Sequence, residues 1–292
     1  MKIKKIEEPI LRTLLYSDIF DYPLTEGEVW KYLISDKNIE YADFSKAIKR
    51  INSVVYRSGN YLHMEKRRSI FDKRHKRNSE SELKLIFARK IIKKLSEIPS
   101  VMFVGISGSL SMLNSEKDHD IDLFVITKHK TIWTTRLLLI SYLKILGLHR
   151  GKDDKKISNK FCLNMIIDDK NLRLPKEYRN IYTAHEITQL MPIVSRNKTY
   201  DKFLKSNKWV LKFLPNAFHK IRGVKEIKSA SLFWFAIPKI AERIAGKIQT
   251  FLINKNKTNE RIEEGFLAFH PRATDKKIMS KYRQKLIKYN LS

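Results

Sequence analysis

Two aspartates, Asp120 and Asp122, stand where an apolar run at residues 123–126 begins. Side chains alternate between the two faces of a strand, so both carboxylates would project from one face while Ile121 projects from the other. Neighbouring carboxylates repel each other unless a cation lies between them, and oxygen ligands suit Mg²⁺. The sequence therefore predicts a magnesium site at Asp120 and Asp122.

A Gly/Ser-rich turn at residues 105–109 lies upstream of this pair and follows the apolar run 101–104. We expect a helix to start at Gly108-Ser109, where unpaired N–H groups and the positive end of the helix would favour a phosphate. A phosphate-binding turn opposite magnesium ligands is the minimum apparatus for handling a nucleoside triphosphate. Ser107, Gly108 and Ser109 are therefore candidate nucleotide-binding residues.

This spacing resembles the signature of the DNA polymerase β-like nucleotidyltransferase superfamily: Gly108-Ser109, ten intervening residues, then Asp120-Ile121-Asp122 within apolar flanks. The resemblance is specific over residues 101–127 and looser to about residue 190. It implies a small mixed sheet flanked by helices, and transfer of a nucleotidyl group with the help of two Mg²⁺ ions.

The superfamily resemblance also implies a third carboxylate, which usually comes from a following strand and helps to deprotonate the attacking hydroxyl. We expect that strand at residues 160–168, with either Cys162, Asn164 and Ile166 or the intervening apolar residues facing inward. The intervening residues are apolar and are expected to be buried in the core, so Asn164 is expected to face Asp120 and Asp122. Asparagine can bind a metal or a substrate, but it cannot accept a proton as a general base.

Other acids remain open as the missing carboxylate. Asp168 and Asp169 stand at the end of the third strand and would reach the site only if the strand curves toward it. Glu186 lies in a helix expected at residues 180–190, where it would either supply the acid or lie on the surface. Its neighbour His185 points about 100° away on a helix, so the two do not form a metal site by themselves.

A long apolar helix is expected at residues 132–148, capped by Thr131, with Arg136 in its second turn. The start of this helix follows the strand that carries the aspartates. Arg136 would therefore either reach the oxygens of a triphosphate or form a salt bridge with a neighbour, and it is retained as a candidate nucleotide-binding residue.

Residues 9–65 indicate three short helices followed by a β-hairpin. A capping box at Thr25 and Glu28 starts the second helix. This order resembles a winged helix-turn-helix domain, whose third helix would face a DNA groove. Such domains also serve as protein-contact or packing modules, so both interpretations stay open. The basic residues of that third helix are Lys46, Lys49 and Arg50.

The formal charge of +28 permits contact with a polyanion, nucleic acid first. The alternative is compositional drift toward lysine, because the excess is spread along the chain; its densest run is at residues 66–77. The single cysteine, Cys162, excludes an intrachain disulfide and is consistent with a reducing cytoplasm. We expect no signal peptide and no membrane association, because the apolar stretches at residues 132–148 and 232–253 carry charged residues.

The expected fold class is α+β: a small mixed β-sheet nucleotidyltransferase core flanked by helices, with an N-terminal winged-helix-like domain and a helical C-terminal region. The expected boundaries are 1–66, 67–98 for a connecting helix, 99–198 for the core, and 199–292. The leading hypothesis is Mg²⁺-dependent transfer of a nucleoside monophosphate from a nucleoside triphosphate to an acceptor hydroxyl, with Asp120, Asp122 and Asn164 as catalytic residues. The alternative is a nucleic-acid-binding regulator whose nucleotidyltransferase module only senses nucleotides. A partner-binding module of the toxin–antitoxin type is a third interpretation.

Overall fold

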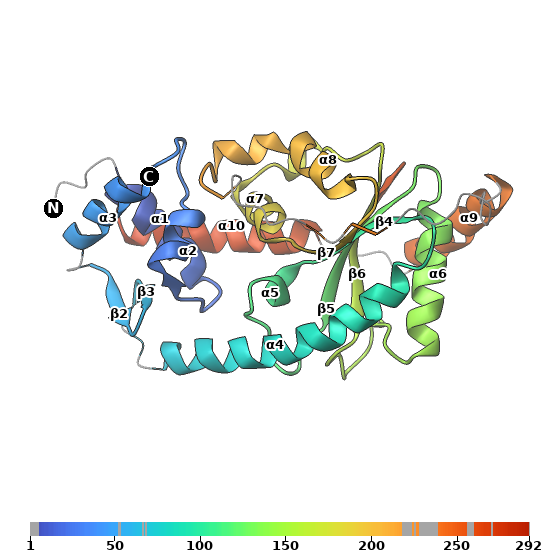
Figure 1. Cartoon of the computed structure of the whole chain (residues 1–292), viewed down its shortest axis with the longest axis horizontal. Helices are drawn as coiled ribbons and strands as arrows, with labels where there is room; N and C mark the ends of the chain where they lie inside the picture. The colour runs from blue at the N-terminus through green and yellow to red at the C-terminus, as the bar shows by residue number, and fades with distance from the viewer. Residues whose placement is uncertain are drawn as a thin grey trace.

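The computed structural model of the chain describes residues 6–51, 54–65, 67, 69–217, 224, 226–227, 239–255, 260–269 and 271–291. It has the α+β architecture that the sequence predicts, with helices on both faces of a mixed sheet (Figure 1). The α-helices are α1 (Glu7–Asp18), α2 (Glu26–Lys31), α3 (Tyr41–Arg50), α4 (Ile70–Leu95), α5 (Gly108–Ser111), α6 (Ile132–Ile145), α7 (Ile181–Gln189), α8 (Thr199–Ser206), α9 (Lys239–Lys255) and α10 (Pro271–Lys288). The strands are β1 (Leu24–Thr25), β2 (Tyr56–Ser58), β3 (Tyr61–His63), β4 (Val101–Ile106), β5 (Ile121–Thr127), β6 (Phe161–Asp168), β7 (Met191–Ser195), β8 (Arg261–Glu263) and β9 (Phe266–Ala268). Two 3-10 helices are η1 (Lys176–Tyr178) and η2 (Lys208–Lys212).

The N-terminal elements form a unit of three helices and a three-stranded antiparallel sheet of order β1-β3-β2. The predicted capping box is present. The Thr25 hydroxyl accepts from the Glu28 backbone N–H at 3.2 Å, and the Glu28 carboxylate accepts from the Thr25 N–H at 2.9 Å. The hairpin of β2 and β3 turns at Gly59, whose φ of 57° lies in the left-handed region that glycine adopts without strain.

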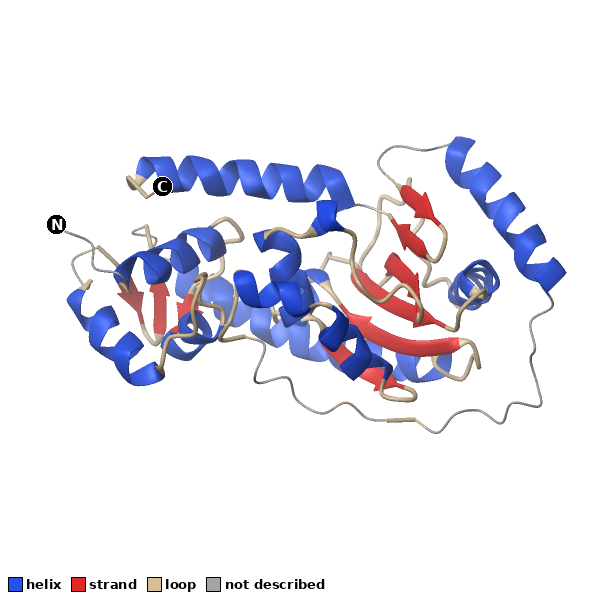
Figure 2. Ribbon diagram, turned by 90° about the horizontal axis from the view of Figure 1, so that it is seen from above, coloured by secondary structure: helices blue, strands red, loops and turns tan. Residues whose placement is uncertain are grey.

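The central sheet has the order β7-β4-β5-β6-β9-β8. β5 and β6 run parallel, and the other neighbouring pairs are antiparallel. Helices lie on both sides of this sheet (Figure 2). On β5, Ile121, Leu123 and Val125 pack with α4 and α6, whereas Phe124 and Ile126 pack with α7 and α8. The alternation predicted for this strand is therefore confirmed, and it directs Asp122 toward the face that α7 and α8 cover.

The register between β5 and β6 shifts at one point. Leu123 pairs with Leu163, but Phe124 pairs with Met165, so Asn164 is an extra residue that forms a bulge. The simple alternation predicted for residues 160–168 is therefore wrong beyond Leu163. Ile166 packs in the same cluster as Leu163, on the face of α4 and α6, while Asn164 and Met165 both line one cavity.

The C-terminal region is not entirely helical, which corrects the helical run predicted from residue 199. The hairpin of β8 and β9 adds to the sheet beside β6. α9 packs against α6, and α10 returns to pack against α1 and α7 (Figure 1). Residues 239–253 of the apolar stretch noted at 232–253 lie in α9; residues 232–238 lie outside the described part of the chain.

One apolar core extends from the N-terminal unit to the sheet. It joins buried residues of α1 and α3, the segment 207–217, α7, α8 and the Phe124 face of the sheet. Asn216 strengthens the connection: its amide accepts from the Ile39 N–H at 3.1 Å and donates to the Trp30 carbonyl at 3.0 Å. The N-terminal unit is thus packed directly against the elements that cover the Asp122 face of the sheet.

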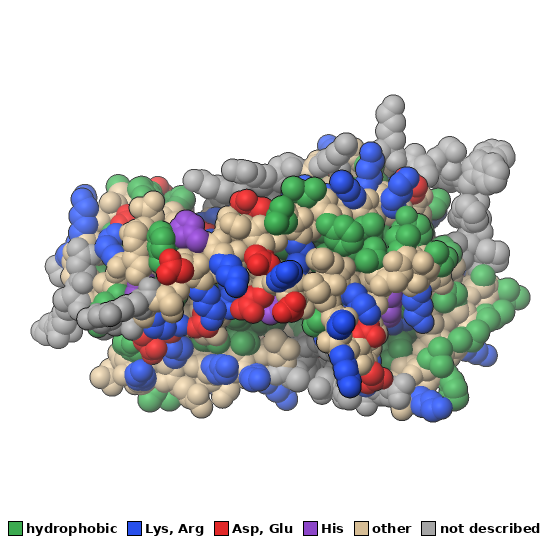
Figure 3. Space-filling view, turned by 90° about the horizontal axis from the view of Figure 1, so that it is seen from below, with side chains coloured by type: hydrophobic (Ala, Val, Ile, Leu, Met, Phe, Trp, Pro, Cys, Tyr) green, Lys and Arg blue, Asp and Glu red, His purple; other side chains and the backbone are tan. Residues whose placement is uncertain are grey.

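Basic residues in the first two turns of α4 contact the N-terminal unit and the loop before β5. Arg74 lies 3.6 Å above the Tyr22 ring and bonds Glu28 at 2.9 Å, and Arg77 bonds Asn114 at 3.1 Å. These contacts occupy part of the basic run at residues 66–77; Lys66 and Arg68 lie outside the described residues. On the face shown in Figure 3, Lys and Arg are interspersed with Asp and Glu.

Candidate functional site

The two aspartates lie side by side. Asp120 directly precedes β5, and Asp122 is the second residue of that strand. One ligand atom from each of Asp120, Asp122 and Cys162 lies within 4.8 Å of the others. Two unit charges at that spacing repel by about 3 kcal/mol at an effective dielectric constant of about 20. A cation or a positive side chain is therefore needed to keep both carboxylates ionised.

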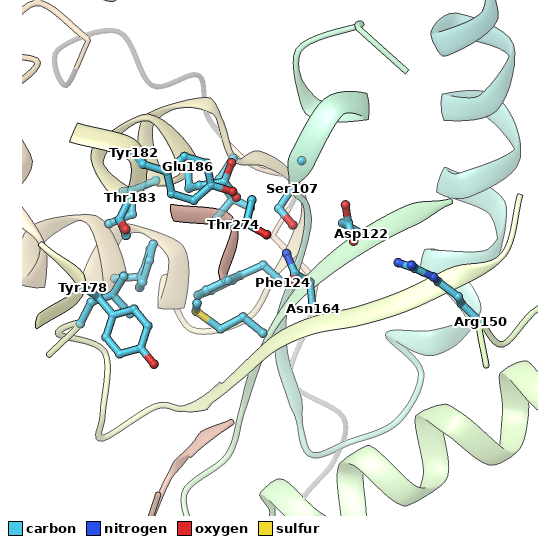
Figure 4. Close-up of a pocket in the computed structure, with 16 residues that line it drawn as sticks. Ser107, Asp122, Phe124, Arg150, Asn164, Tyr178, Tyr182, Thr183, Glu186 and Thr274 are labelled. Atoms are coloured by element: carbon cyan, nitrogen blue, oxygen red, sulfur yellow. The ribbon is translucent and has the colours of Figure 1, made fainter. Parts of the chain in front are cut away.

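The Gly/Ser-rich turn lies against Asp122. The Ser107 backbone N–H donates to the Asp122 carbonyl at 2.9 Å, which fixes the turn on β5. Gly108 has a φ of 65°, and a β-carbon there would collide with Asp122 Oδ2 and lie 3.3 Å from Cγ. Only glycine allows this close approach. Ser107, Gly108 and Asp122 consequently line one cavity of about 330 Å³ (Figure 4).

The helix expected at Gly108-Ser109 is a single turn, α5, that ends at Ser111. A dipole of a long helix is therefore not available to a phosphate, and the first amides of the turn remain as donors. Ser109 lines a second cavity of about 180 Å³ instead of the first one, together with Gly108. The Ser107 hydroxyl is buried, lines the larger cavity and has no hydrogen-bond partner among the described residues.

A lysine fixes the loop that delivers Asp120. Lys84 of α4 is 5% exposed, and its ammonium donates to the carbonyls of His119 at 2.6 Å and Glu116 at 2.8 Å. Ser81, one turn earlier, accepts from the Ser115 N–H at 3.0 Å. These bonds hold the segment before β5 in place without using any acid of the site.

Arg150 supplies the positive charge that the carboxylates need in this structure. Its Nη1 lies 2.5 Å from Asp120 Oδ2. The pKa of Asp122 is raised to about 8, first by burial and then by the charges of Asp120 and Glu186, while Arg150 acts in the opposite direction. Near neutral pH and without a bound cation, Asp122 is therefore mostly protonated, and a divalent cation would favour its ionised form.

The third strand places a thiol where the sequence analysis expected an amide. Cys162 pairs with Asp122 across the parallel ladder, and Asn164 lies in the bulge further along. Asn164 still lines the larger cavity with Asp122, but Cys162 is the residue beside both aspartates. Burial, followed by the charges of Asp122 and Asp120, raises the pKa of Cys162 to about 12.

α7 forms the opposite wall. Its N-terminus is capped by Asn180, whose side chain accepts from the Thr183 N–H at 2.9 Å. Glu186 and Tyr182 lie across the cavity from Asp122 (Figure 4). Burial raises the pKa of Glu186 to about 7. Glu186, one of the acids left open by the sequence, thus faces the site and is not a surface residue.

Glu186 and Tyr182 also line the second cavity, which lies between α7 and the N-terminal unit. Its walls carry the rings of Tyr16 and Tyr22. His185 stacks on Tyr16 at 4.2 Å between ring centroids, and burial lowers its pKa to about 3, so the imidazole is neutral. The two cavities meet at Glu186 and Tyr182, one on each side of the same carboxylate.

Three other candidates lie elsewhere. Arg136 does not line the cavity that contains Asp122: it bonds Gln249 at 2.6 Å and lies 4.6 Å above the Phe269 ring, which fits the neighbour-bonding alternative. Asp168 accepts from the Asn171 N–H at 3.0 Å and pairs with His129. Asp169 accepts from the His129 backbone N–H at 2.9 Å. Both acids therefore form their contacts at the C-terminal end of β6.

The sequence did not indicate Arg150, and Asn164 was expected where Cys162 lies. In the structure the Ile121 N–H donates to the Lys160 carbonyl at 2.8 Å, so the two parallel strands start at the same level and Asp122 pairs with Cys162. This register is a contact between distant segments that no local pattern shows. Arg150 likewise reaches the site through a short bridge beside Phe161.

Comparisons with known proteins do not assign this chain. No family model matches the sequence, and neither the curated proteins nor the solved structures contain a match. Within the described residues, every helix is too short or too polar to cross a bilayer. The function must therefore be argued from the residues of the site.

Proposed function

We propose that this chain is a nucleotidyltransferase that transfers a nucleoside monophosphate from a nucleoside triphosphate to an acceptor hydroxyl and releases pyrophosphate. The observation that carries the proposal is that ligand atoms of Asp120 and Asp122 lie close together at the start of β5, next to the Ser107-Gly108 turn. The carboxylate pair and the Gly/Ser-rich turn, which the sequence indicates separately, are therefore neighbours.

In this proposal, β4, α5, β5 and β6 form the nucleotidyltransferase core that the sequence motif resembles. The larger cavity would hold the triphosphate. The free Ser107 hydroxyl and the first amides of α5 would donate to phosphate oxygens. Phe124 and Tyr178, which line the same cavity, offer apolar surface to the nucleoside.

Asp120 and Asp122 would hold Mg²⁺. Their ligand atoms lie close enough together to share one divalent cation, and the close approach allowed by Gly108 leaves the Asp122 carboxylate at the phosphate-binding turn. A bound divalent ion would polarise the α-phosphate and offset the charge that develops during transfer. Cys162 is not a ligand that Mg²⁺ prefers.

Glu186 would act as the general base. The acceptor oxygen attacks the α-phosphorus, the bond from that phosphorus to the bridging oxygen of the β-phosphate breaks, and pyrophosphate leaves with the electron pair. The acceptor proton passes to Glu186, whose pKa of about 7 suits a base near neutral pH. Because Glu186 lines both cavities, the acceptor would enter from the smaller one.

A second candidate function is favoured by one observation: β6 places Cys162 and Asn164, and no carboxylate, next to Asp122. The protein would then bind a nucleoside triphosphate without transferring it. The N-terminal unit would be a winged-helix-like module, since its element order is α1-β1-α2-α3-β2-β3. On α3, Lys46 and Lys49 are exposed and would contact duplex DNA, whereas Arg50 bonds Glu7 at 2.8 Å.

Incubation with each α-labelled nucleoside triphosphate and Mg²⁺, with and without total RNA, tests the leading proposal. We expect a labelled product from the wild type and a loss of at least about 100-fold in Asp122→Asn. Asp118→Asn is the matched control, because Asp118 is exposed on the same loop and lies outside both cavities. Equal activity in Asp122→Asn would overturn the assignment.

The regulatory candidate predicts a different outcome of that experiment. Triphosphate would bind without release of pyrophosphate, and the protein would bind duplex DNA with an affinity that falls steeply with salt. Lys46→Glu together with Lys49→Glu would then weaken duplex binding. Transfer of label with unchanged duplex binding in that double variant would exclude this candidate.

A further inference from the structure

The site next to the turn contains a sulfur atom. Asp122 lies on β5, Asp120 directly precedes that strand, Cys162 lies on the parallel neighbour β6, and one ligand atom of each lies within 4.8 Å of the other two. Cys162 is 8% exposed, and it is the single cysteine of the chain. The pairing of Cys162 with Asp122 in the ladder fixes this arrangement by the backbone and not by a flexible loop.

A second, independent observation comes from the cavity that Asp122 lines together with the Ser107-Gly108 turn; Asp120 and Cys162 do not line this cavity. Ser107 is 6% exposed, lines the same cavity as Asp122, and its hydroxyl has no partner among the residues that the structure describes. A buried hydroxyl without a hydrogen bond is rare, since the loss of water is not compensated. A metal-bound water or an oxygen of a metal-bound anion would satisfy it.

The charge of the site points to a cation. Asp120, Asp122 and Glu186 are acids that face this region, and Arg150 bonds Asp120 at 2.5 Å and also hydrogen-bonds the Cys162 thiol. Arg150 uses a single oxygen of Asp120. Ionising Asp122 and Glu186 as well as Asp120 sets three negative charges against this guanidinium, and a divalent cation would offset the excess.

We propose that Asp120, Asp122 and Cys162 form a mixed oxygen–sulfur site that binds a borderline-soft divalent cation, of the Zn²⁺ or Co²⁺ type, more tightly than Mg²⁺. Thiolate selects such ions, whereas Mg²⁺ selects oxygen. Ligand atoms around a tetrahedral zinc ion lie about 3.3–3.8 Å apart. The observed spacing therefore needs only small side-chain rotations to close.

Binding is a ligand exchange without redox change. The sulfur–metal bond forms as the thiol proton leaves to water, and a fourth position stays open for water or a phosphate oxygen. The inference rests on the proposed function only in sharing Asp120 and Asp122 with it. It identifies which ion that site prefers, and it holds whether or not nucleotide transfer takes place.

Titration of the full-length, metal-free protein with Co²⁺ tests the inference, because a cobalt–thiolate bond gives a near-ultraviolet charge-transfer band. We expect the band to saturate at one equivalent in the wild type and to be absent in Cys162→Ser. Competition with Zn²⁺ should show at least about tenfold weaker binding in Cys162→Ser, and Asp118→Asn should match the wild type. Circular dichroism confirms that each variant is folded, and Cys162→Ala serves if the serine variant is not.

Cys162→Asp provides the reverse test, since it replaces the sulfur with a third carboxylate. We expect this variant to bind Mg²⁺ more tightly and Zn²⁺ more weakly than the wild type. Cobalt binding without the sulfur band, or equal Zn²⁺ affinity in Cys162→Ser, would overturn the inference. Transfer activity with Mg²⁺ and no sulfur band would overturn this inference alone, and a sulfur band without transfer would overturn the proposed function alone.

Discussion

The close approach of Asp122 to Gly108 leads to a prediction with a matched control. In Gly108→Ala, a φ of 65° costs an alanine about 1–2 kcal/mol of folding free energy. For a chain of this size, that lowers the melting temperature by about 2–6 °C. The new β-carbon also overlaps Asp122 Oδ2, so the carboxylate must rotate away from the turn. A displacement of about 1 Å at a reacting centre costs about 100-fold in rate.

Gly147→Ala is the control, because Gly147 has a φ of 68° and no atom within 4 Å of an added β-carbon. Differential scanning calorimetry should show that both variants lose stability, with the larger loss in Gly108→Ala because of the overlap with Asp122. Transfer of label and nucleotide binding should fall only in Gly108→Ala. Full activity in Gly108→Ala, or an equal loss in Gly147→Ala, would refute the assigned contact between the turn and the carboxylate.

Three further predictions follow from the site and its supports. Lys84→Met should lower the free energy of unfolding by about 2–4 kcal/mol in urea titration, because buried carbonyls lose a charged donor; the exposed Lys90→Met should change it by less than about 0.5 kcal/mol. The raised pKa of Asp122 favours the protonated carboxyl in the folded state, so its contribution to stability is complete below about pH 4 and is lost as the pH rises toward 8. In metal-free buffer, Asp122→Asn should therefore gain stability over the wild type by up to about 1.4 kcal/mol per pH unit between those values, and a constant difference would contradict the assigned environment. Glu186→Gln should slow transfer by about 10²–10⁴-fold and remove the rise of the wild-type rate through about pH 7, and an unchanged pH profile would show that Glu186 is not the base.

Local sequence patterns predicted the parts of the fold that local interactions fix. The capping box at Thr25 and Glu28 depends on two residues three positions apart, and it forms as expected. The alternation of β5 depends on the apolar residues of one strand, and it places Asp120 and Asp122 on a shared face. Such features need no knowledge of distant segments.

Features that depend on pairing between distant segments were not predictable in this way. The bulge at Asn164 exists only because β6 runs beside β5, and the alignment of the two strand starts, not Asn164, places Cys162 next to Asp122. Arg150 reaches Asp120 through a bridge to the start of β6. The strands β8 and β9 have three residues each, too few to show a period of two, so a helical C-terminal region was the natural expectation.

The most direct measurement of the central claim follows two labels in one reaction. The wild-type protein is incubated with a divalent cation and a nucleoside triphosphate labelled at either the α- or the γ-phosphate. If Asp120, Asp122 and the Gly108 turn hold a triphosphate for nucleotidyl transfer, the α-label moves to the acceptor and the γ-label is released as pyrophosphate. Transfer of the γ-label to the acceptor, or recovery of both labels in intact triphosphate, would contradict the proposed reaction.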